Sequence, residues 1–312
     1  MSSLRKGLNA GLKTTWTLSK VIFPITLIVT ILQFTPVLTW IINFVEPLMG
    51  LLGLSGEAAI PLVLGNALNL YAGIAGILSL ELTVKEVFIL AVMLSFSHNL
   101  FIETGVALRV GVKLWVILAV RFGLAIFSAL IIRFVWQGGG EIAKYGFFSE
   151  QTQNPTGWGE IVLLGFEKAS LGILQLAIIV IPLMIIVQYL RDLKYLEKVS
   201  NALAPFTKVI GVQPNTSMTL VAGLIIGLAY GAGIMIQAVE EDGVSKKDAT
   251  LAFIFLVACH AVIEDTLIFV PLGIPILPLL IIRVVTAFVL TIIVAHLWKR
   301  ADLKAHKGVT QL

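Results

Sequence analysis

The sequence predicts an all-α membrane protein with about 8–10 transmembrane helices in two repeats of opposite orientation. Three observations support this fold class. First, 58% of the 312 residues are hydrophobic, only 13% are charged, and the mean hydropathy is +0.99. A water-soluble protein of this length could not bury so much apolar surface. Second, apolar stretches recur along the whole chain, and third, rare polar residues inside them recur in the same order in the two halves.

Most of the apolar stretches reach the roughly 20 residues that a helix needs to cross a bilayer. They are residues 14–34, 57–80, 84–108, 113–136, 160–190, 216–240, 248–272 and 275–298. Two shorter stretches, 37–54 and 195–211, contain Pro47 and Pro205 and are either short crossings or helices at the membrane surface. Glycine and asparagine residues within 57–80 indicate either a broken helix or a re-entrant hairpin.

One long polar segment, residues 137–159, divides the chain nearly in half. It is rich in Gly, Thr, Gln and Asn, and we interpret it as a loop outside the cell that links the two halves. We therefore expect a first membrane repeat over 1–136, a second over 160–298, and a cytoplasmic tail over 299–312.

The two halves match in an alignment that we call the repeat alignment. Gly65 falls on Gly223 and, after a short insertion near residues 241–243 of the second half, His98 falls on His260. The other matched pairs include Pro47 with Pro205, Lys85 with Lys247, Glu103 with Asp265, Thr104 with Thr266, and Arg121 with Arg283. Apolar matches are common by chance in such a sequence, but aligned polar residues inside apolar helices are not. This pattern predicts an internal repeat.

Lysine and arginine are enriched in cytoplasmic loops, so their positions predict the orientation of the chain. If each half crosses the membrane five times, most basic residues, such as Arg109 and Lys113, fall on the cytoplasmic side together with both termini. An odd number of crossings gives the second half an inverted orientation. We therefore expect a multi-pass protein of the plasma (inner) membrane. The net charge of +4 follows from this topology and does not indicate nucleic-acid binding.

Polar and ionisable side chains deep in apolar helices are costly and usually face the bundle interior or a cavity. The predicted substrate- or ion-binding residues are His98, Asn99, Glu103, Thr104, His260, Glu264, Asp265, Thr266, Asn66 and Asn69, with Arg121 and Arg283 as charge partners. The carboxylates could coordinate a cation or carry a coupling proton, and sodium is the other candidate coupling ion. The histidines could take up a proton near neutral pH or ligate a metal, and the amides and hydroxyls could hydrogen-bond a solute. We predict no resident cofactor.

The same residues also have a structural interpretation. In it Arg121 pairs with Glu103, and the histidines cap broken helices. Arg283 pairs with Asp265 in the same way. On a straight helix His98 and Glu103 lie about 140° apart. Either the helix breaks near them, or the two side chains have different partners.

Two short segments carry a family resemblance. Residues 97–105 (Ser-His-Asn-Leu-Phe-Ile-Glu-Thr-Gly) and 259–266 (Cys-His-Ala-Val-Ile-Glu-Asp-Thr), each followed by an arginine-bearing helix, resemble the Gate or "nucleoside recognition" family. That family includes spore maturation membrane proteins and parts of concentrative nucleoside transporters and of the bacterial ferrous-iron transporter. The resemblance covers about residues 40–136 and 195–298 and implies helical inverted repeats in the plasma membrane. The glycine-glutamine-threonine-glutamate stretch of nucleoside carriers is absent, so the substrate class is implied only loosely.

The predicted function is that of a secondary transporter. It would move a small polar, nucleoside-like solute or an ion through a site near the bilayer midplane at the repeat interface. The first alternative is a membrane subunit that scaffolds a spore-maturation-like complex without transporting, and the second is an intramembrane enzyme. The chain has no phosphate-binding GxxxxGK[ST] motif, which argues against an ATPase or GTPase activity of its own. The expected partners are the lipid bilayer, the solute or ion, and either further copies of the chain or a partner membrane protein.

Overall fold

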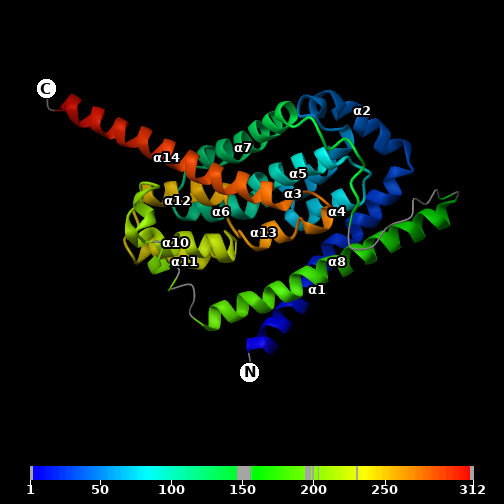
Figure 1. The fold of residues 1–312 in the computed structure, drawn as a ribbon, viewed down its shortest axis with the longest axis horizontal. Helices are drawn as coiled ribbons and strands as arrows, with labels where there is room; N and C mark the ends of the chain where they lie inside the picture. The colour runs from blue at the N-terminus through cyan, green and yellow to red at the C-terminus, as the bar shows by residue number, and fades with distance from the viewer. Residues whose placement is uncertain are drawn as a thin grey trace. The chain divides into compact units, whose positions relative to one another are not determined.

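The protein is all-helical, as predicted (Figure 1). The computed structural model describes residues 3–145, 155, 157–193, 198, 200–202, 204–229 and 231–309. The first half contains α1 (Ser3–Gln33), α2 (Pro36–Leu51), η1 (Gly56–Ala58), α3 (Ala59–Ala67), α4 (Leu70–Leu78), α5 (Val84–Ser97), α6 (Leu100–Arg109) and α7 (Leu114–Val135). The second half contains α8 (Trp158–Asp192), η2 (Phe206–Lys208), η3 (Pro214–Thr216), α10 (Ser217–Val221), η4 (Ala222–Ile226), α11 (Ala232–Glu240), α12 (Lys246–Ala258), α13 (Glu264–Leu267), η5 (Val270–Leu272) and α14 (Ile276–Val309).

Fewer helices are long enough to cross a membrane than the 8–10 that the sequence predicted. Within the described part of the chain there are five such helices, or six if the pair Thr39–Leu51 and Gly56–Ala67, bent by 91°, counts as one span. The five are Ser3–Gln33, Val84–Arg109, Leu114–Val135, Trp158–Ile186 and Ile276–Arg300, where Val84–Arg109 counts α5 and α6 together. The count of long helices is lower than the predicted number of crossings because several apolar stretches in the described residues do not form single helices. For example, 248–272 breaks after Ala258.

The stretch 57–80 forms a helical hairpin, one of the two alternatives left open by the sequence. Helices α3 and α4 pack against each other, and they approach so closely that a Cβ at Gly73 would lie 3.1 Å from the Cα of Gly65. Asn69 begins the second helix of the hairpin, because its side-chain oxygen accepts a hydrogen bond from the backbone N–H of Ala72 at 2.9 Å.

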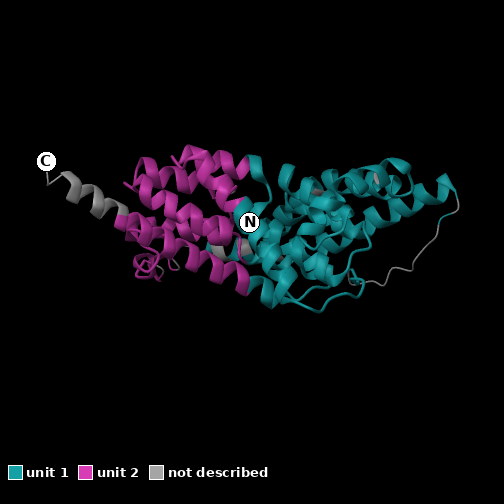
Figure 2. Cartoon of the chain, turned by 90° about the horizontal axis from the view of Figure 1, so that it is seen from above, with its two compact units in different colours: residues 1–101, 122–193, 263–280 teal, residues 102–121, 194–262, 281–312 magenta. Residues whose placement is uncertain are grey.

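The chain forms two compact units, and each takes segments from both halves of the sequence (Figure 2). Unit 1 comprises residues 1–101, 122–193 and 263–280, and unit 2 comprises residues 102–121, 194–262 and 281–312. The segment 102–121 of the first half therefore belongs to unit 2, and the segment 263–280 of the second half belongs to unit 1. These segments occupy nearly equivalent positions in the repeat alignment, so the halves exchange matching parts.

Helices α1 and α8 of unit 1 form a close antiparallel pair (Figure 1). A Cβ at Gly7 would lie 2.6 Å from the Cα of Ile185, and a Cβ at Gly165 would lie 2.8 Å from the Cδ1 of Leu27. The two contacts are equivalent, because the repeat alignment carries Gly7 onto Gly165 and Leu27 onto Ile185. Small residues let helix backbones approach closely inside a membrane.

The N-terminal ends of α5 and α12 are built alike. Thr83 caps α5, where its hydroxyl lies 2.8 Å from an oxygen of Glu86. Ser245 caps α12, where its hydroxyl lies 2.7 Å from an oxygen of Asp248. Each cap hydroxyl also accepts a hydrogen bond from the backbone N–H of that acidic residue, which satisfies one of the free donors at a helix start. The two caps are equivalent in the repeat alignment.

Two predicted segments are described only in part. In the expected linker 137–159, residues 146–154 and 156 lie outside the described residues. Its first part packs on the start of α5, where the backbone N–H of Val84 donates to the carbonyl of Glu141 at 2.9 Å. In the expected tail 299–312, α14 continues to Val309. The external position of the linker and the cytoplasmic position of the tail stay predictions.

Candidate functional site

Each half carries its candidate residues at a break between two helices. In the first half α5 ends at Ser97, and Asn99 adopts φ 51°, a left-handed conformation that few residues other than glycine take. The backbone N–H of Asn99 donates to the carbonyl of Gly65 at 2.8 Å, which holds the break against the α3–α4 hairpin.

The second half repeats this geometry. Helix α12 ends at Ala258, and Ala261 adopts φ 40°. Its backbone N–H donates to the carbonyl of Gly223 at 2.9 Å. Gly223 and Ala261 are the counterparts of Gly65 and Asn99 in the repeat alignment. The sequence left open whether the helix breaks or the polar groups have different partners, and the structure shows that the helix breaks in both halves.

The two histidines are oriented in the same way. The Nδ1 of His98 lies 2.7 Å from the carbonyl oxygen of Leu94, and the Nδ1 of His260 lies 2.8 Å from the carbonyl oxygen of Leu256. A carbonyl only accepts hydrogen bonds, so we assign the proton of each ring to Nδ1. The Nε2 atom of each ring is then left to face a carboxylate.

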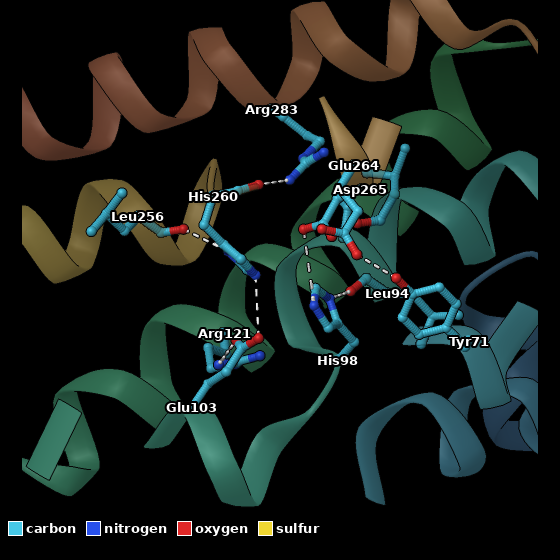
Figure 3. Close-up of polar contacts among 12 residues, drawn as sticks. Tyr71, Leu94, His98, Glu103, Arg121, Leu256, His260, Glu264, Asp265 and Arg283 are labelled. Carbon is cyan, nitrogen blue, oxygen red and sulfur yellow. Dashed lines mark hydrogen bonds and ion pairs between the residues drawn. The ribbon is translucent and has the colours of Figure 1, made fainter. Parts of the chain in front are cut away.

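In unit 1, His98 faces a carboxylate of the other half of the chain (Figure 3). Its Nε2 lies 4.0 Å from the Oδ2 of Asp265, and both side chains are buried. Beside them the hydroxyl of Tyr71 donates a short hydrogen bond to Glu264, the residue before Asp265. Unit 1 thus gathers two carboxylates, an imidazole and a phenol. Tyr71 was missed in the sequence analysis because a tyrosine in an apolar stretch carries no signal of its own.

In unit 2, His260 faces a carboxylate of the first half. Its Nε2 lies 3.3 Å from the Oε1 of Glu103, and the Oε2 of Glu103 accepts a hydrogen bond from Nη1 of Arg121 at 2.8 Å. The Arg121 side chain is fully buried, so Glu103 is neutralised inside the protein. Because Nδ1 of His260 already holds a proton, a hydrogen bond between Nε2 and Oε1 needs a second proton on one of these two atoms.

The second buried arginine also lies in unit 2. Arg283 donates from Nη2 to the backbone carbonyl of His260 at 2.6 Å. This contact holds the broken segment after α12 by its backbone. The pairing of Arg283 with Asp265 stays a prediction, because the two residues belong to different units.

The remaining predicted residues differ in their surroundings. The side-chain oxygens of Asn66 and Asn99 in unit 1, and the hydroxyl of Thr104 in unit 2, are buried and have no hydrogen-bond partner among the described residues. Thr266 is buried in unit 1, whereas the side-chain oxygen of Asn69 already caps α4. Buried acceptors without a donor are rare and call for an explanation, such as a bound ligand or water.

The comparisons with known proteins agree with the family resemblance. The family model described as Gate, nucleoside recognition, matches residues 15–114 and 173–288. An uncharacterized membrane protein of Bacillus subtilis (strain 168), YvoD, is 65% identical over 294 residues, which is 94% of each chain. No solved structure matches. The matched segments lie one in each half, begin at positions that are equivalent in the repeat alignment, and include both histidines and all the carboxylates of the two clusters.

Proposed function

The chain belongs to the Gate, or nucleoside recognition, family of multi-pass membrane proteins, and we propose that it is a secondary transporter rather than an enzyme. Its cargo would be a small polar solute or an ion. The main observation in support of this proposal is that each unit buries a histidine of one half of the chain against a carboxylate of the other half.

Burial of these groups is costly. A charged side chain in the hydrocarbon region costs several kcal/mol, about 2.5–3.5 kcal/mol on insertion scales. A purely structural helix bundle could fill the same positions with apolar side chains at no such cost. The cost of burying the histidines and carboxylates is explained if they take up protons, bind cations or hydrogen-bond a solute.

We further propose that the halves are inverted repeats. The support lies in matched local structures: the close glycine contacts of α1 and α8, the caps of α5 and α12, and the two helix breaks. Lys85 donates to the carbonyl of Trp136, and the repeat alignment pairs these residues with Lys247 and Trp298, where the ammonium of Lys247 lies 5.6 Å from the ring centre of Trp298. Inverted repeats of this kind are a common plan of secondary transporters.

The two units would then have different roles. In unit 1 Glu264 and Asp265 bring two carboxylates together, which suits a coupling proton or sodium ion. In unit 2 the carboxylate that faces the histidine, Glu103, is already compensated by Arg121. The repeat alignment pairs Glu264 with Ile102, so the first half has no carboxylate at the equivalent position, and Glu264 is not explained by the repeat. The buried oxygens of Asn66 and Asn99 would accept hydrogen bonds from the N–H or O–H groups of a solute.

The test is ligand-induced stabilisation of the detergent-purified protein, followed by uptake into proteoliposomes. The panel holds nucleosides, carboxylates, divalent metals and sodium, each at two pH values. A ligand at 100 times its Kd raises the free energy of unfolding by about 2.7 kcal/mol. We expect one class to stabilise the protein, and Asp265→Asn and Glu264→Gln to remove both the stabilisation and the uptake.

The matched control is Glu240→Gln, which removes an exposed carboxylate at the end of α11 and should leave both readouts intact. If the site variants insert normally and keep uptake, the clusters are structural. If no ligand stabilises the protein or is taken up, the alternative of a non-transporting scaffold replaces the transporter.

A further inference from the structure

The N-terminal part of α1 is too long and too charged to lie inside the bilayer core. At 1.5 Å per residue the 31 residues of α1 extend about 46 Å, against a hydrocarbon thickness of about 30 Å. Three of the four basic residues of α1, Arg5, Lys6 and Lys13, lie in residues 3–13, and Lys20 lies about 10 Å further along the helix. The last twenty residues of α1, 14–33, extend about 30 Å and can span the core, so residues 3–13 lie beyond it, and Lys20 reaches the edge of the core by extending its side chain toward the N-terminal end.

The same N-terminal part nevertheless exposes large apolar side chains. Leu4 is 50% exposed, Leu8 40%, Leu12 51% and Trp16 66%. Their spacing of one residue in every four places them along one side of the helix, next to the face that Gly7 and Gly11 pack on α8. We call these four residues the N-terminal apolar stripe.

Basic residues line the outer edge of this stripe. At 100° per residue Arg5, Lys13 and Lys20 project on the side of the stripe that is away from α8. All three are exposed, and the ammonium of Lys20 lies 5.4 Å from the ring centre of Trp16. Trp16 lies near the point where α1 enters the core, and a tryptophan beside a lysine is typical of the membrane–water interface, where the ring and the extended charged group meet head groups.

The adjoining end of α8 has the same character. Lys6 Nζ lies 3.7 Å from Asp192 Oδ1, so the start of α1 and the end of α8 lie together. Near this end α8 exposes Ile186 and Tyr189, at 52% and 44%, and Leu193, which follows the helix, is 62% exposed. Water would disfavour so much exposed apolar surface, and hydrocarbon would disfavour the charges. The interfacial layer of the bilayer satisfies both.

We propose that the N-terminal apolar stripe and its basic edge form a binding surface for anionic phospholipid head groups. The apolar side chains insert between the upper parts of the acyl chains, and Arg5, Lys13 and Lys20 contact the phosphates. Each basic residue near an anionic membrane surface contributes about 1 kcal/mol, which is about a fivefold effect on affinity. This surface is independent of the polar clusters and of the transport proposal.

The test is titration of the purified full-length protein with phosphatidylglycerol or phosphatidylcholine, with bound lipid counted by native mass spectrometry. The variant carries Arg5→Gln, Lys13→Gln and Lys20→Gln. We expect its affinity for phosphatidylglycerol to fall on the order of a hundredfold, with little change for phosphatidylcholine. The matched control carries Arg109→Gln, Lys113→Gln and Lys208→Gln, which removes the same charge from exposed positions elsewhere and should change the affinity less than about threefold.

An equal loss in both triple variants would overturn the proposal, because net charge alone would then explain the binding. Equal affinity of the unaltered protein for the two lipids would overturn it too, and would assign the stripe to a protein partner.

A second measurement does not depend on the triple variant folding. A fluorophore on Leu12→Cys, in a Cys259→Ala background, should be quenched more by spin labels on lipid head groups than by labels in mid-chain. The reverse order, or no quenching by either, contradicts an interfacial position.

Discussion

The close approach of α1 and α8 permits a sharp test of glycine packing. A Cβ at Gly7 would lie 2.6 Å from the Cα of Ile185, and a Cβ at Gly11 would lie 2.8 Å from the Cα of Ile181. Both obstacles are backbone atoms of a long helix, so rotation of a side chain cannot relieve them. The double variant Gly7→Ala plus Gly11→Ala must push the helices apart or distort one of them.

The expected magnitude follows from two opposing terms. Overpacking costs about 1–3 kcal/mol per site, so the pair costs about 2–6 kcal/mol. Alanine is a better helix former than glycine by about 1 kcal/mol per site, which returns about 2 kcal/mol. We therefore expect a net loss of up to about 4 kcal/mol in the free energy of unfolding.

The chain offers a matched control. Apart from the backbone of its own helix, neither Gly123 in α7 nor Gly172 in α8 has an atom within 4 Å of the place that a Cβ would take. Gly123→Ala plus Gly172→Ala therefore gains the same helix preference without overpacking. Reversible unfolding in mixed detergent, followed by circular dichroism, measures both double variants. The Gly7–Gly11 variant should be less stable than the control variant by about 2–6 kcal/mol. Equal stabilities would refute the close contact of α1 and α8.

Three further predictions test other parts of the structure. Arg121→Leu leaves the buried Glu103 without its guanidinium partner and should lower the free energy of unfolding by about 3–5 kcal/mol. Adding Glu103→Gln should restore part of this loss, and a loss below about 1 kcal/mol in the single variant would contradict a buried pair. Thr83→Ala and Ser245→Ala each remove a helix cap and should lower stability by about 1 kcal/mol, and clearly unequal losses would count against the repeat. A hydrogen bond from the Ser3 side chain lowers the pKa of Asp192 in the folded protein below its ordinary 3.8. The ionised carboxylate therefore stabilises the fold above pH 3.8, and this stabilisation is lost as the pH falls through the lower pKa of the folded state. Melting temperatures between about pH 2.5 and 6 should show this loss in the unaltered protein and not in Asp192→Asn.

The repeat positions were visible in the sequence because polar residues stand out in apolar stretches. His98 and His260, with the carboxylates that follow them, were identified in this way, and the helix break, one of the two alternatives that the sequence left open, lies at Asn99. The pairing of Arg121 with Glu103 was predicted and is confirmed, but the partners of the two histidines and of Glu264 could not be predicted. Tyr71 meets Glu264 across 193 residues of sequence, and no local pattern encodes such a contact. Helix periodicity relates residues a few positions apart, whereas the fold decides which distant segments meet.

Fewer long helices were found than membrane crossings were predicted, for a related reason. Hydropathy reports that a segment avoids water, but it does not separate a straight helix from two short ones that fold back on each other. In 57–80 the deciding feature is the contact of Gly65 with Gly73, and this contact depends on the packing of α3 against α4. The glycine content of 57–80 indicated that the helix could break there, but it did not indicate the direction of the chain after the break.

The exchange of segments between the halves has a consequence for biosynthesis. Unit 1 is complete only with residues 263–280, which leave the ribosome after nearly all of the chain, and unit 2 needs residues 102–121 from the first half. His98 therefore meets Asp265 only late in synthesis, and neither half produced alone contains a whole unit. Until then the early helices lie in the membrane without the carboxylate that faces Nε2 of His98, at a stage when membrane chaperones and proteases have access to them.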